Sequence, residues 1–147
     1  MKQQFLAVFI AVQLLAFPAA SADYKKGEAA YGKGDYAAAL KELRPLTEQG
    51  NSRAQGLLGL MYVQGQGVPL DYEKAAKWFR LSAEQGYALA QYSLGVAYAN
   101  GDGVPQDDKE ALKWIRLAAE QGAAIAQSDL APCTAKEWAP RKTTRKH

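Results

Sequence analysis

Residues 51–86 read NSRAQGLLGLMYVQGQGVPLDYEKAAKWFRLSAEQG, and residues 87–122 read YALAQYSLGVAYANGDGVPQDDKEALKWIRLAAEQG. The two stretches align without a gap over 36 residues, of which 19 are identical. A tandem repeat of this period is typical of a supersecondary unit that stacks on copies of itself. The repetition therefore predicts an array of units whose function lies on a surface rather than inside a globular core.

Each unit divides into two helices around Gly-x-Gly-Val-Pro. In the first half, a stripe of identical residues from Ala54 to Tyr62 follows helical spacing. The second half begins at Asp71 or Asp107, which are good N-cap residues, and Asp107 with Glu110 has the spacing of a capping box. The pattern predicts an antiparallel helical hairpin in each unit.

A glycine stands inside each first helix, at Gly59 and at Gly95. Glycine in a helix interior costs about 1 kcal/mol relative to alanine. Because this cost occurs in both units, we expect the backbone of the neighbouring helix to approach closely at both positions.

The repeat extends beyond the two complete units. Residues 23–50 form a shortened N-terminal hairpin of the same kind, with the ending Glu-Gln-Gly, and residues 123–131 begin a further, truncated repeat. Degenerate terminal units are common in solenoids because an end unit packs on one neighbour only. The expected helices are 25–32, 36–48, 52–64, 72–85, 88–100, 108–121 and 124–130.

These residues resemble those of Sel1-like repeat proteins, relatives of the tetratricopeptide class. The resemblance rests on Ala-x-x-x-Leu-Gly-x-x-Tyr, Gly-x-Gly-Val-Pro-x-Asp, Lys-Trp and Ala-Glu-Gln-Gly, each of which occurs in both units. It implies an all-α, right-handed α-solenoid of antiparallel helical hairpins. It also implies a likeness to scaffold and adaptor proteins, which hold other proteins on the concave side of the superhelix.

Residues 1–22 have the three parts of a secretory signal peptide. Lys2 supplies the positive start, residues 5–17 are the apolar stretch, and small residues precede a cleavage site between Ala22 and Asp23. A membrane anchor is the alternative, but the apolar run of about 13 residues is short against the roughly 20 that a spanning helix needs. We therefore expect a periplasmic or secreted protein without stable membrane insertion after cleavage.

The net charge of +3 comes from the C-terminal end of the chain. Residues 23–130 contain 12 Lys and Arg against 14 Asp and Glu, whereas residues 131–147 contain five against one. A basic tail can bind nucleic acid, but no aromatic residues alternate with these charges, and exported proteins rarely meet nucleic acid. The expectation is a disordered basic tail over residues 132–147 and no nucleic-acid partner.

The same tail has the character of a frameshift product. Back-translation of residues 131–147, read one nucleotide out of phase, permits Gly-Ala-Met-Tyr-Gly-Lys-Gly-Met-Gly-Ala-Pro-Gln-Asp-Tyr-Lys-Glu-Ala. This phase restores the tyrosine, the glycines and the Pro-Gln-Asp of the repeat, in register with residues 98–107. The sequence therefore predicts that the tail replaces a repeat that the other phase encodes.

The sequence offers little for catalysis or for a cofactor. The single histidine is His147 and the single cysteine is Cys133, both in the tail. Carboxylates between Asp102 and Glu110 suggest calcium, but they lack EF-hand spacing, and helix capping explains two of them. Trp78 and its repeat equivalent could form a binding ladder, but their helical register favours packing. We expect no catalytic residues, no metal and no cofactor.

The positions at which the two units differ on their first helices remain as candidates for partner binding. Arg53 aligns with Leu89, and Gly56 aligns with Tyr92. Arg53 and Tyr92 are the two candidate contact residues for a protein or peptide partner. Two alternatives to an exported, non-enzymatic scaffold stay open at this point. One is an envelope hydrolase or a β-lactam- or peptidoglycan-binding protein, and the other is a truncated remnant without independent function.

Overall fold

The computed structural model describes residues 17–130, with side chains from residue 24 onward. This part of the chain forms seven helices and contains no strand. The helices are α2 (Phe17–Gly32), α3 (Tyr36–Glu48), α4 (Ser52–Gln64), α5 (Tyr72–Glu84), α6 (Ala88–Asn100), α7 (Asp108–Glu120) and α8 (Ala124–Leu130). The predicted all-α fold is confirmed.

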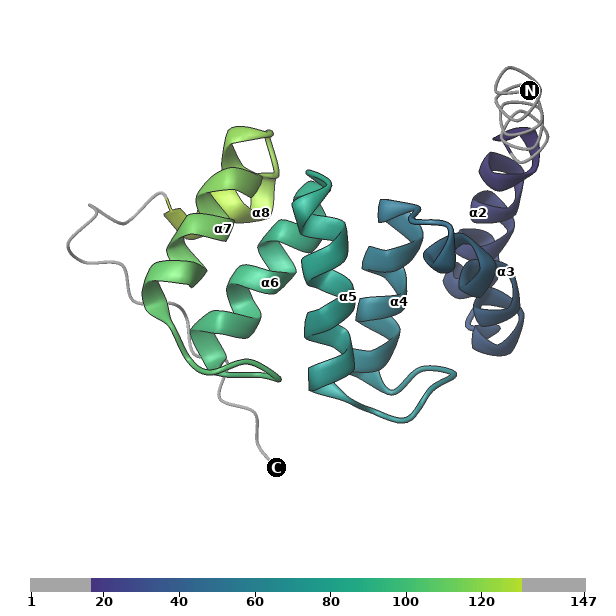
Figure 1. Cartoon of the computed structure of the whole chain (residues 1–147), viewed down its shortest axis with the longest axis horizontal. Coiled ribbons are helices and arrows are strands. Elements are labelled where there is room, and N and C mark those ends of the chain that lie inside the picture. Colours follow the sequence, from purple (N-terminus) through teal and green to yellow (C-terminus); the bar gives the residue numbers. More distant parts are fainter. Residues whose placement is uncertain (1–16, 131–147) are drawn as a thin grey trace, which may run out of the picture.

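Consecutive helices lie side by side along the molecule, with α2 at one end and α8 at the other (Figure 1). The helices pair as antiparallel hairpins, α2 with α3, α4 with α5 and α6 with α7, and α8 begins the next unit. Each hairpin also packs on the helix that follows it in the chain. The result is a solenoid, in which a unit contacts its sequence neighbours.

Six of the seven helices begin and end within one residue of their predicted bounds. The prediction for the first helix was wrong, because α2 begins at Phe17 rather than at residue 25. Pro18 is tolerated in the first turn of a helix, and the residues that follow contain no helix breaker before Tyr24. The proposed cleavage site between Ala22 and Asp23 therefore lies within α2.

Aspartate or asparagine side chains cap α3, α4, α5 and α7 at their N-termini, whereas Tyr87 before α6 makes no such bond. Asp71 accepts a hydrogen bond from the Lys74 backbone at 3.0 Å, and Asp107 does the same for Glu110 at 3.1 Å. The predicted capping box is only half formed, since the backbone N–H of Asp107 donates to the carbonyl oxygen of Tyr98 at 3.0 Å. These local bonds explain why the helix starts were readable from the sequence.

The two helix-interior glycines make room for different neighbours. A Cβ atom at Gly95 would lie 3.0 Å from the carbonyl oxygen of Ala111 and 2.6 Å from Cγ1 of Ile115. At Gly59 it would lie 2.6 Å from the ring of Phe79. The predicted backbone approach is confirmed at Gly95, whereas at Gly59 an aromatic ring takes the space.

The second glycine of Gly-x-Gly-Val-Pro sets the spacing between units. Gly103 has φ +72°, and a Cβ there would lie 2.1 Å from the carbonyl oxygen of Tyr72, the first residue of the preceding unit's second helix. In the same way, a Cβ atom at Gly67 would lie 2.9 Å from the Cβ atom of Tyr36. Each loop therefore rests against the start of a helix one unit earlier, which only glycine permits.

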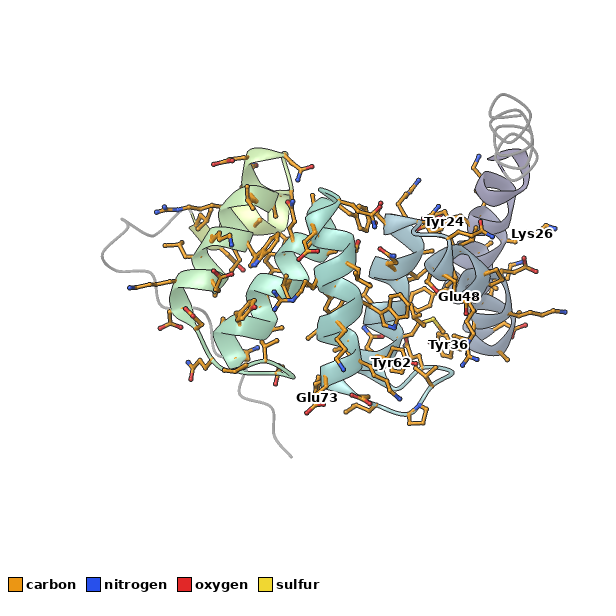
Figure 2. All side chains as sticks on the ribbon, in the orientation of Figure 1. Tyr24, Lys26, Tyr36, Glu48, Tyr62 and Glu73 are labelled. Carbon is orange, nitrogen blue, oxygen red and sulfur yellow. The ribbon has the colours of Figure 1, made fainter. Side chains whose placement is uncertain are left out.

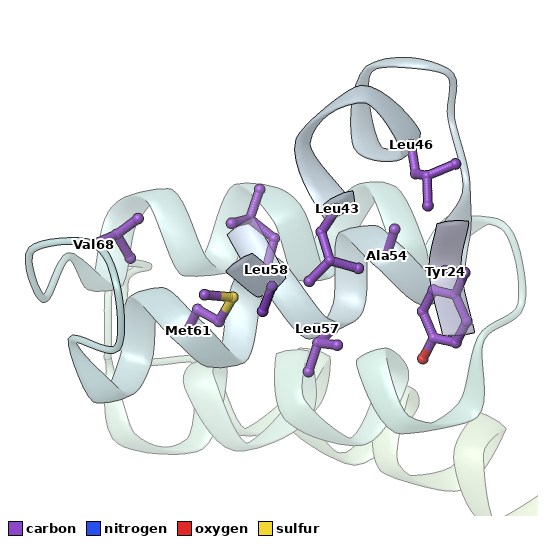
Figure 3. Packing of buried hydrophobic residues seen from close by; sticks show 9 residues of the cluster. Tyr24, Leu43, Leu46, Ala54, Leu57, Leu58, Met61 and Val68 are labelled. Carbon is purple, nitrogen blue, oxygen red and sulfur yellow. The ribbon is translucent and has the colours of Figure 1, made fainter. Parts of the chain in front are cut away.

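The buried side chains form a continuous series rather than one central core. The N-terminal cluster joins α2, α3 and α4 through residues such as Tyr24, Leu43 and Met61 (Figure 3). A second cluster joins α5, α6 and α7, and a small third cluster, which includes Ala126, holds α8. Charged side chains such as that of Lys26 project away from these clusters (Figure 2).

Candidate functional site

Charged residues are distributed unequally between the two helices of each complete repeat. The first helices of these two repeats contain almost none: α4 carries Arg53 and α6 carries no charged residue. The second helices contain five in α5 and six in α7. A helix surface that faces solvent normally carries charged residues. The surfaces of α4 and α6 are unusual because they carry almost none.

Several side chains of these first helices reach the surface. We define the first-helix face by seven of the exposed and half-buried side chains of α4 and α6, which are Arg53, Leu60, Val63, Leu89, Tyr92, Ser93 and Val96. It includes both candidate contact residues from the sequence. The repeat units differ on this face more than in the buried stripe, as the sequence comparison suggested.

A pocket of about 200 Å³ opens between α4, α5 and α6. Its walls are mainly apolar and include Leu60, Val63, Ala76, Phe79, Tyr92 and Val96. Asp102, in the loop after α6, also lines it. The pocket joins the first helices of two successive units, with α5 between them.

Tyr92 forms one wall of this pocket and is also fixed from the other side. Its hydroxyl group donates a hydrogen bond to the carboxylate of Asp129 in α8 at 2.8 Å. The ring is therefore held between the pocket and the last described helix. Tyr92 thus combines half-exposure with a defined position, which suits a contact residue.

Arg53 lies at the other end of the first-helix face and contacts the N-terminal hairpin. Its guanidinium group stacks over the ring of Tyr24 at 4.7 Å and lies 4.0 Å from the carboxylate of Glu28. Its side chain is still 58% exposed. The structure does not bring Arg53 into the pocket with Tyr92, so these two candidates occupy separate parts of one face.

Tyr24 is the buried partner in this contact. Burial, followed by the neighbouring Tyr87 and Glu28, raises the pKa of Tyr24 to about 12. Its hydroxyl group donates to Glu28 at 3.3 Å. The neutral ring therefore serves as packing for α2 and as a platform for the arginine.

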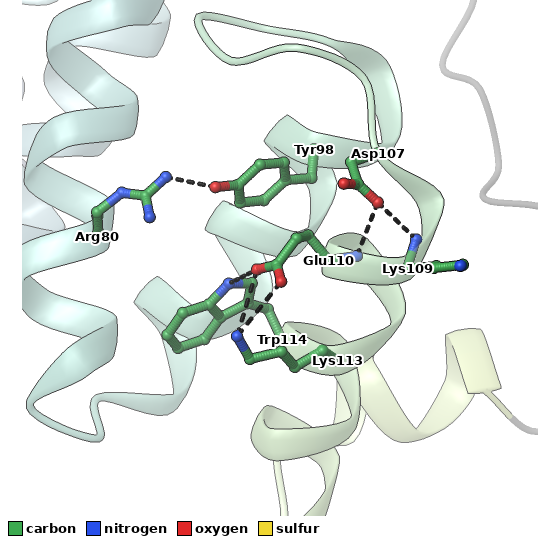
Figure 4. Close-up of polar contacts among 7 residues, drawn as sticks. All are labelled: Arg80, Tyr98, Asp107, Lys109, Glu110, Lys113 and Trp114. Carbon is green, nitrogen blue, oxygen red and sulfur yellow. Dashed lines mark hydrogen bonds and ion pairs between the residues drawn. The ribbon is translucent and has the colours of Figure 1, made fainter.

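A group of polar contacts on α5, α6 and α7 includes one that connects neighbouring units (Figure 4). The guanidinium group of Arg80 in α5 donates to the hydroxyl group of Tyr98 in α6, and the indole N–H of Trp114 donates to Glu110 at 3.2 Å. Trp114 is only 8% exposed and belongs to the second core cluster. The predicted packing role of this tryptophan is confirmed. The bond from Arg80 to Tyr98 joins α5 to α6, and the burial of Trp114 joins α7 to both.

Within residues 17–130, no group of three or more His, Cys, Asp or Glu side chains is arranged to hold a metal ion. In the same part of the chain, no helix is long and apolar enough to cross a membrane. His147, Cys133 and the predicted disordered tail lie outside the described residues.

Sequence reasoning missed most of the pocket. The sequence singled out Tyr92, but it did not single out Ala76 or Val63, which line the pocket with it. One signal was present, because Ala76 aligns with Leu112 in the next unit, so the first unit has a smaller side chain at this position. Such a difference between repeats indicates space only once the neighbouring helices are in place.

Comparison with known proteins agrees with this architecture. The Sel1 repeat family matches residues 52–87 and 88–122. No curated protein matches the chain. Among solved structures, a Sel1 repeat protein from Oxalobacter formigenes is 38% identical with a TM-score of 0.70. The matched region covers 74% of this chain and 45% of the Oxalobacter formigenes chain.

Two further solved structures are similar. A protective antigen of uropathogenic Escherichia coli that displays an SLR fold is 40% identical with a TM-score of 0.71, and covers 77% of this chain and 25% of its own. Helicobacter pylori cysteine rich protein B has a TM-score of 0.58 at 24% identity, covers 61% of this chain and 68% of its own, and supports the fold alone. This chain thus spans less than half of the first two proteins. With two matched repeats on a solenoid of helical hairpins, it is a Sel1 repeat protein.

Proposed function

We propose that this protein is an exported, non-enzymatic adaptor that binds a protein or peptide partner on its first-helix face. Sel1 repeat proteins are commonly protein-interaction scaffolds, which supports the general class of function. The choice of the first-helix face as the binding surface is based on this chain's own residues.

The observation that carries the proposal is the near absence of charge on α4 and α6, together with the pocket between them. Protein interfaces are depleted of charged residues at their centres and enriched in aromatic residues such as Tyr92. Leu89 is 41% exposed on the same face. A half-apolar, charge-poor surface of this kind is suited to association rather than to solvation alone.

A matched pair of leucine variants tests the face. Leu89→Arg places a charge on the first-helix face, and Leu81→Arg places it on α5, where Leu81 is 47% exposed. Tagged variants are used to capture partners from an envelope extract, and captured proteins are compared by quantitative mass spectrometry. A specific partner should be lost with Leu89→Arg and retained with Leu81→Arg. Equal capture by both variants would place binding elsewhere.

Export is tested separately from binding. The charged start, the apolar stretch and the small residues before Asp23 support cleavage after Ala22. Expression in a bacterial host, followed by N-terminal sequencing of the periplasmic fraction, should give a chain that begins at Asp23. A chain that stays in the cytoplasm with its first residues intact would contradict export.

The non-enzymatic part of the proposal is tested with the purified protein. Incubation with peptidoglycan fragments and with a chromogenic β-lactam should give no turnover above buffer. Turnover that is abolished by a carboxylate-to-amide substitution would establish an enzyme instead.

A further inference from the structure

We propose that the first complete repeat binds a carboxylate group of an acidic peptide at the indole N–H of Trp78, with Lys74 and Lys77 beside it on α5. The site lies on a second helix and shares no residue with the first-helix face. It is therefore an additional interaction site. Its chemistry follows from a difference between the two repeats at equivalent positions.

The second repeat contains a carboxylate at the equivalent place (Figure 4). The indole N–H of Trp114 donates to Glu110 at 3.2 Å, and the ammonium group of Lys113 lies 3.4 Å from both oxygens of the same carboxylate. Lys113 also lies over the Trp114 ring, 5.1 Å from its centroid. One carboxylate, a helical turn before the tryptophan, thus accepts from an indole and from an ammonium group.

The first repeat has both donors but lacks this acid. Lys77 and Trp78 occupy the positions of the two donors, and Lys74 stands where the second repeat has Glu110. Among the described residues, neither the indole N–H of Trp78 nor the ammonium group of Lys77 has a hydrogen-bond or ion-pair partner. Trp78 is half-buried, whereas Trp114 is only 8% exposed. The donors of the first repeat are therefore accessible to an acceptor from outside.

Lys74 adds positive charge without closing the site. Its ammonium group lies 3.7 Å from the carboxylate of Asp71, which caps α5, and 5.7 Å from the centroid of the Tyr62 ring. It thus offsets the charge of this acid. The Lys74 side chain is 59% exposed on a flexible stem, so it is free to turn toward a bound anion.

The neighbouring hairpin contributes two further donors. In the second repeat, Arg80 of the preceding unit donates to the hydroxyl group of Tyr98. Arg44 and Tyr62 are the equivalent pair one unit earlier. In the part of the chain that the structure describes, neither this guanidinium group nor this hydroxyl group makes a hydrogen bond. Donors that the second repeat satisfies internally thus remain available in the first.

A carboxylate from a partner would supply the missing acceptor. Hydrogen bonds between an N–H donor and an ionised carboxylate are stronger than those between neutral groups. Because the internal acceptor of the second repeat is a glutamate side chain, an acidic side chain of a peptide is the ligand that this comparison favours. The C-terminal carboxylate of a peptide has the same chemistry, and the experiment separates the two.

A short peptide with one carboxylate serves as the probe. Acetyl-Gly-Ser-Glu-Ser-Gly-amide is titrated into the isotope-labelled protein and followed by the NMR signals of the indole N–H groups. The Trp78 signal, assigned by its loss in Trp78→Phe, should move, and the Trp114 signal should stay. Replacing the glutamate of the peptide by glutamine should weaken binding about threefold or more, because the charge-assisted bonds are lost. Added salt should also weaken binding.

The source of the carboxylate is tested with a second peptide. Acetyl-Gly-Ser-Gln-Ser-Gly with a free C-terminus carries its one carboxylate at the end of the chain. It should bind more weakly than the glutamate peptide. Tighter binding would overturn the assignment to an acidic side chain and give the site to a peptide C-terminus.

Variants that exchange residues between the repeats identify the site in the protein. Lys74→Glu gives the first repeat the acid of the second, which should satisfy Trp78 internally and abolish binding. Lys77→Ala should weaken binding about threefold, as expected for an exposed ion pair. Lys113→Ala is the matched control in α7 and should leave the affinity unchanged, because Lys113 is already engaged by Glu110. Circular dichroism verifies that each variant is folded.

Two results would overturn the proposal. One is equal affinity for the glutamate and glutamine peptides in the unaltered protein. The other is undiminished binding by Lys74→Glu. Leu89→Arg, which tests the first-helix face, should leave the affinity for the glutamate peptide unchanged, so the two sites are judged separately.

Discussion

The side-chain amide of Gln85 at the end of α5 donates to the side-chain oxygen of Gln55 in α4 at 2.7 Å. Gln121 donates to Gln91 in the next unit at 2.6 Å. The acceptor glutamine donates in turn to a carbonyl oxygen at the end of the previous unit's second helix, as Gln55 does to Thr47 at 3.2 Å. Each complete unit thus has a partly buried chain of hydrogen bonds that links three consecutive helices.

Replacement of Gln91 tests this chain of bonds. Gln91 is 5% exposed and donates to the carbonyl oxygen of Ala83 at 3.2 Å. Gln91→Leu should lower the free energy of unfolding by about 1–3 kcal/mol, because a buried carbonyl oxygen and the Gln121 amide lose their partner. Urea denaturation measures the change. Gln127→Leu alters the equivalent bond of α8 at an exposed position and should cost clearly less.

Substitution of Gly95 tests the close contact between α6 and α7. Gly95→Ala costs about 1–3 kcal/mol through overpacking, and the gain of about 1 kcal/mol in helix propensity offsets part of this, so the free energy of unfolding should fall by up to about 2 kcal/mol. The added methyl group meets the Ala111 carbonyl oxygen, which the helix cannot move freely. Gly32→Ala is the control, since a Cβ there meets nothing within 4 Å. A stabilised Gly95→Ala protein in thermal unfolding would contradict this contact.

The raised pKa of Tyr24 predicts a loss of stability in alkali. The folded protein keeps the phenolic proton up to about pH 12, whereas the unfolded chain releases it near the ordinary tyrosine pKa of 10.0. Folding is therefore favoured fully below pH 10, and this contribution is lost as the pH rises from 10 toward 12. Tyr24→Phe should flatten that part of the stability curve relative to the unaltered protein. Parallel curves in urea titrations across this pH range would show that Tyr24 is not the cause.

The tail gives a prediction about residues beyond the described part of the chain. Deletion of residues 132–147 should leave the melting temperature nearly unchanged. A one-nucleotide change that restores the repeat phase after Leu130 should raise it, because a further hairpin adds a buried interface on α8. Differential scanning calorimetry compares the three proteins. A large loss of stability on deletion would show that the tail contributes to folding and would count against the frameshift interpretation.

The sequence alone determined the class of fold and nearly all the helix bounds. These depend on local chemistry, such as the Asp71 side chain that caps its own helix and the glycines with positive φ that end others. The start of α2 escaped prediction because Pro18 and the alanines after it permit a helix without marking its beginning. A helix start without a capping residue leaves no clear signal in the sequence.

The tertiary structure decided which residues come into contact at the surface. The sequence named Arg53 and Tyr92 as variable positions, but their partners, Tyr24 and Asp129, stand 29 and 37 residues away in the chain. The pocket likewise depends on how α4 and α6 meet across α5, where the small side chain of Ala76 leaves room. Caps and turns act between near neighbours in the sequence, whereas these contacts depend on the side-chain packing of separate helices, which the repeat pattern does not specify.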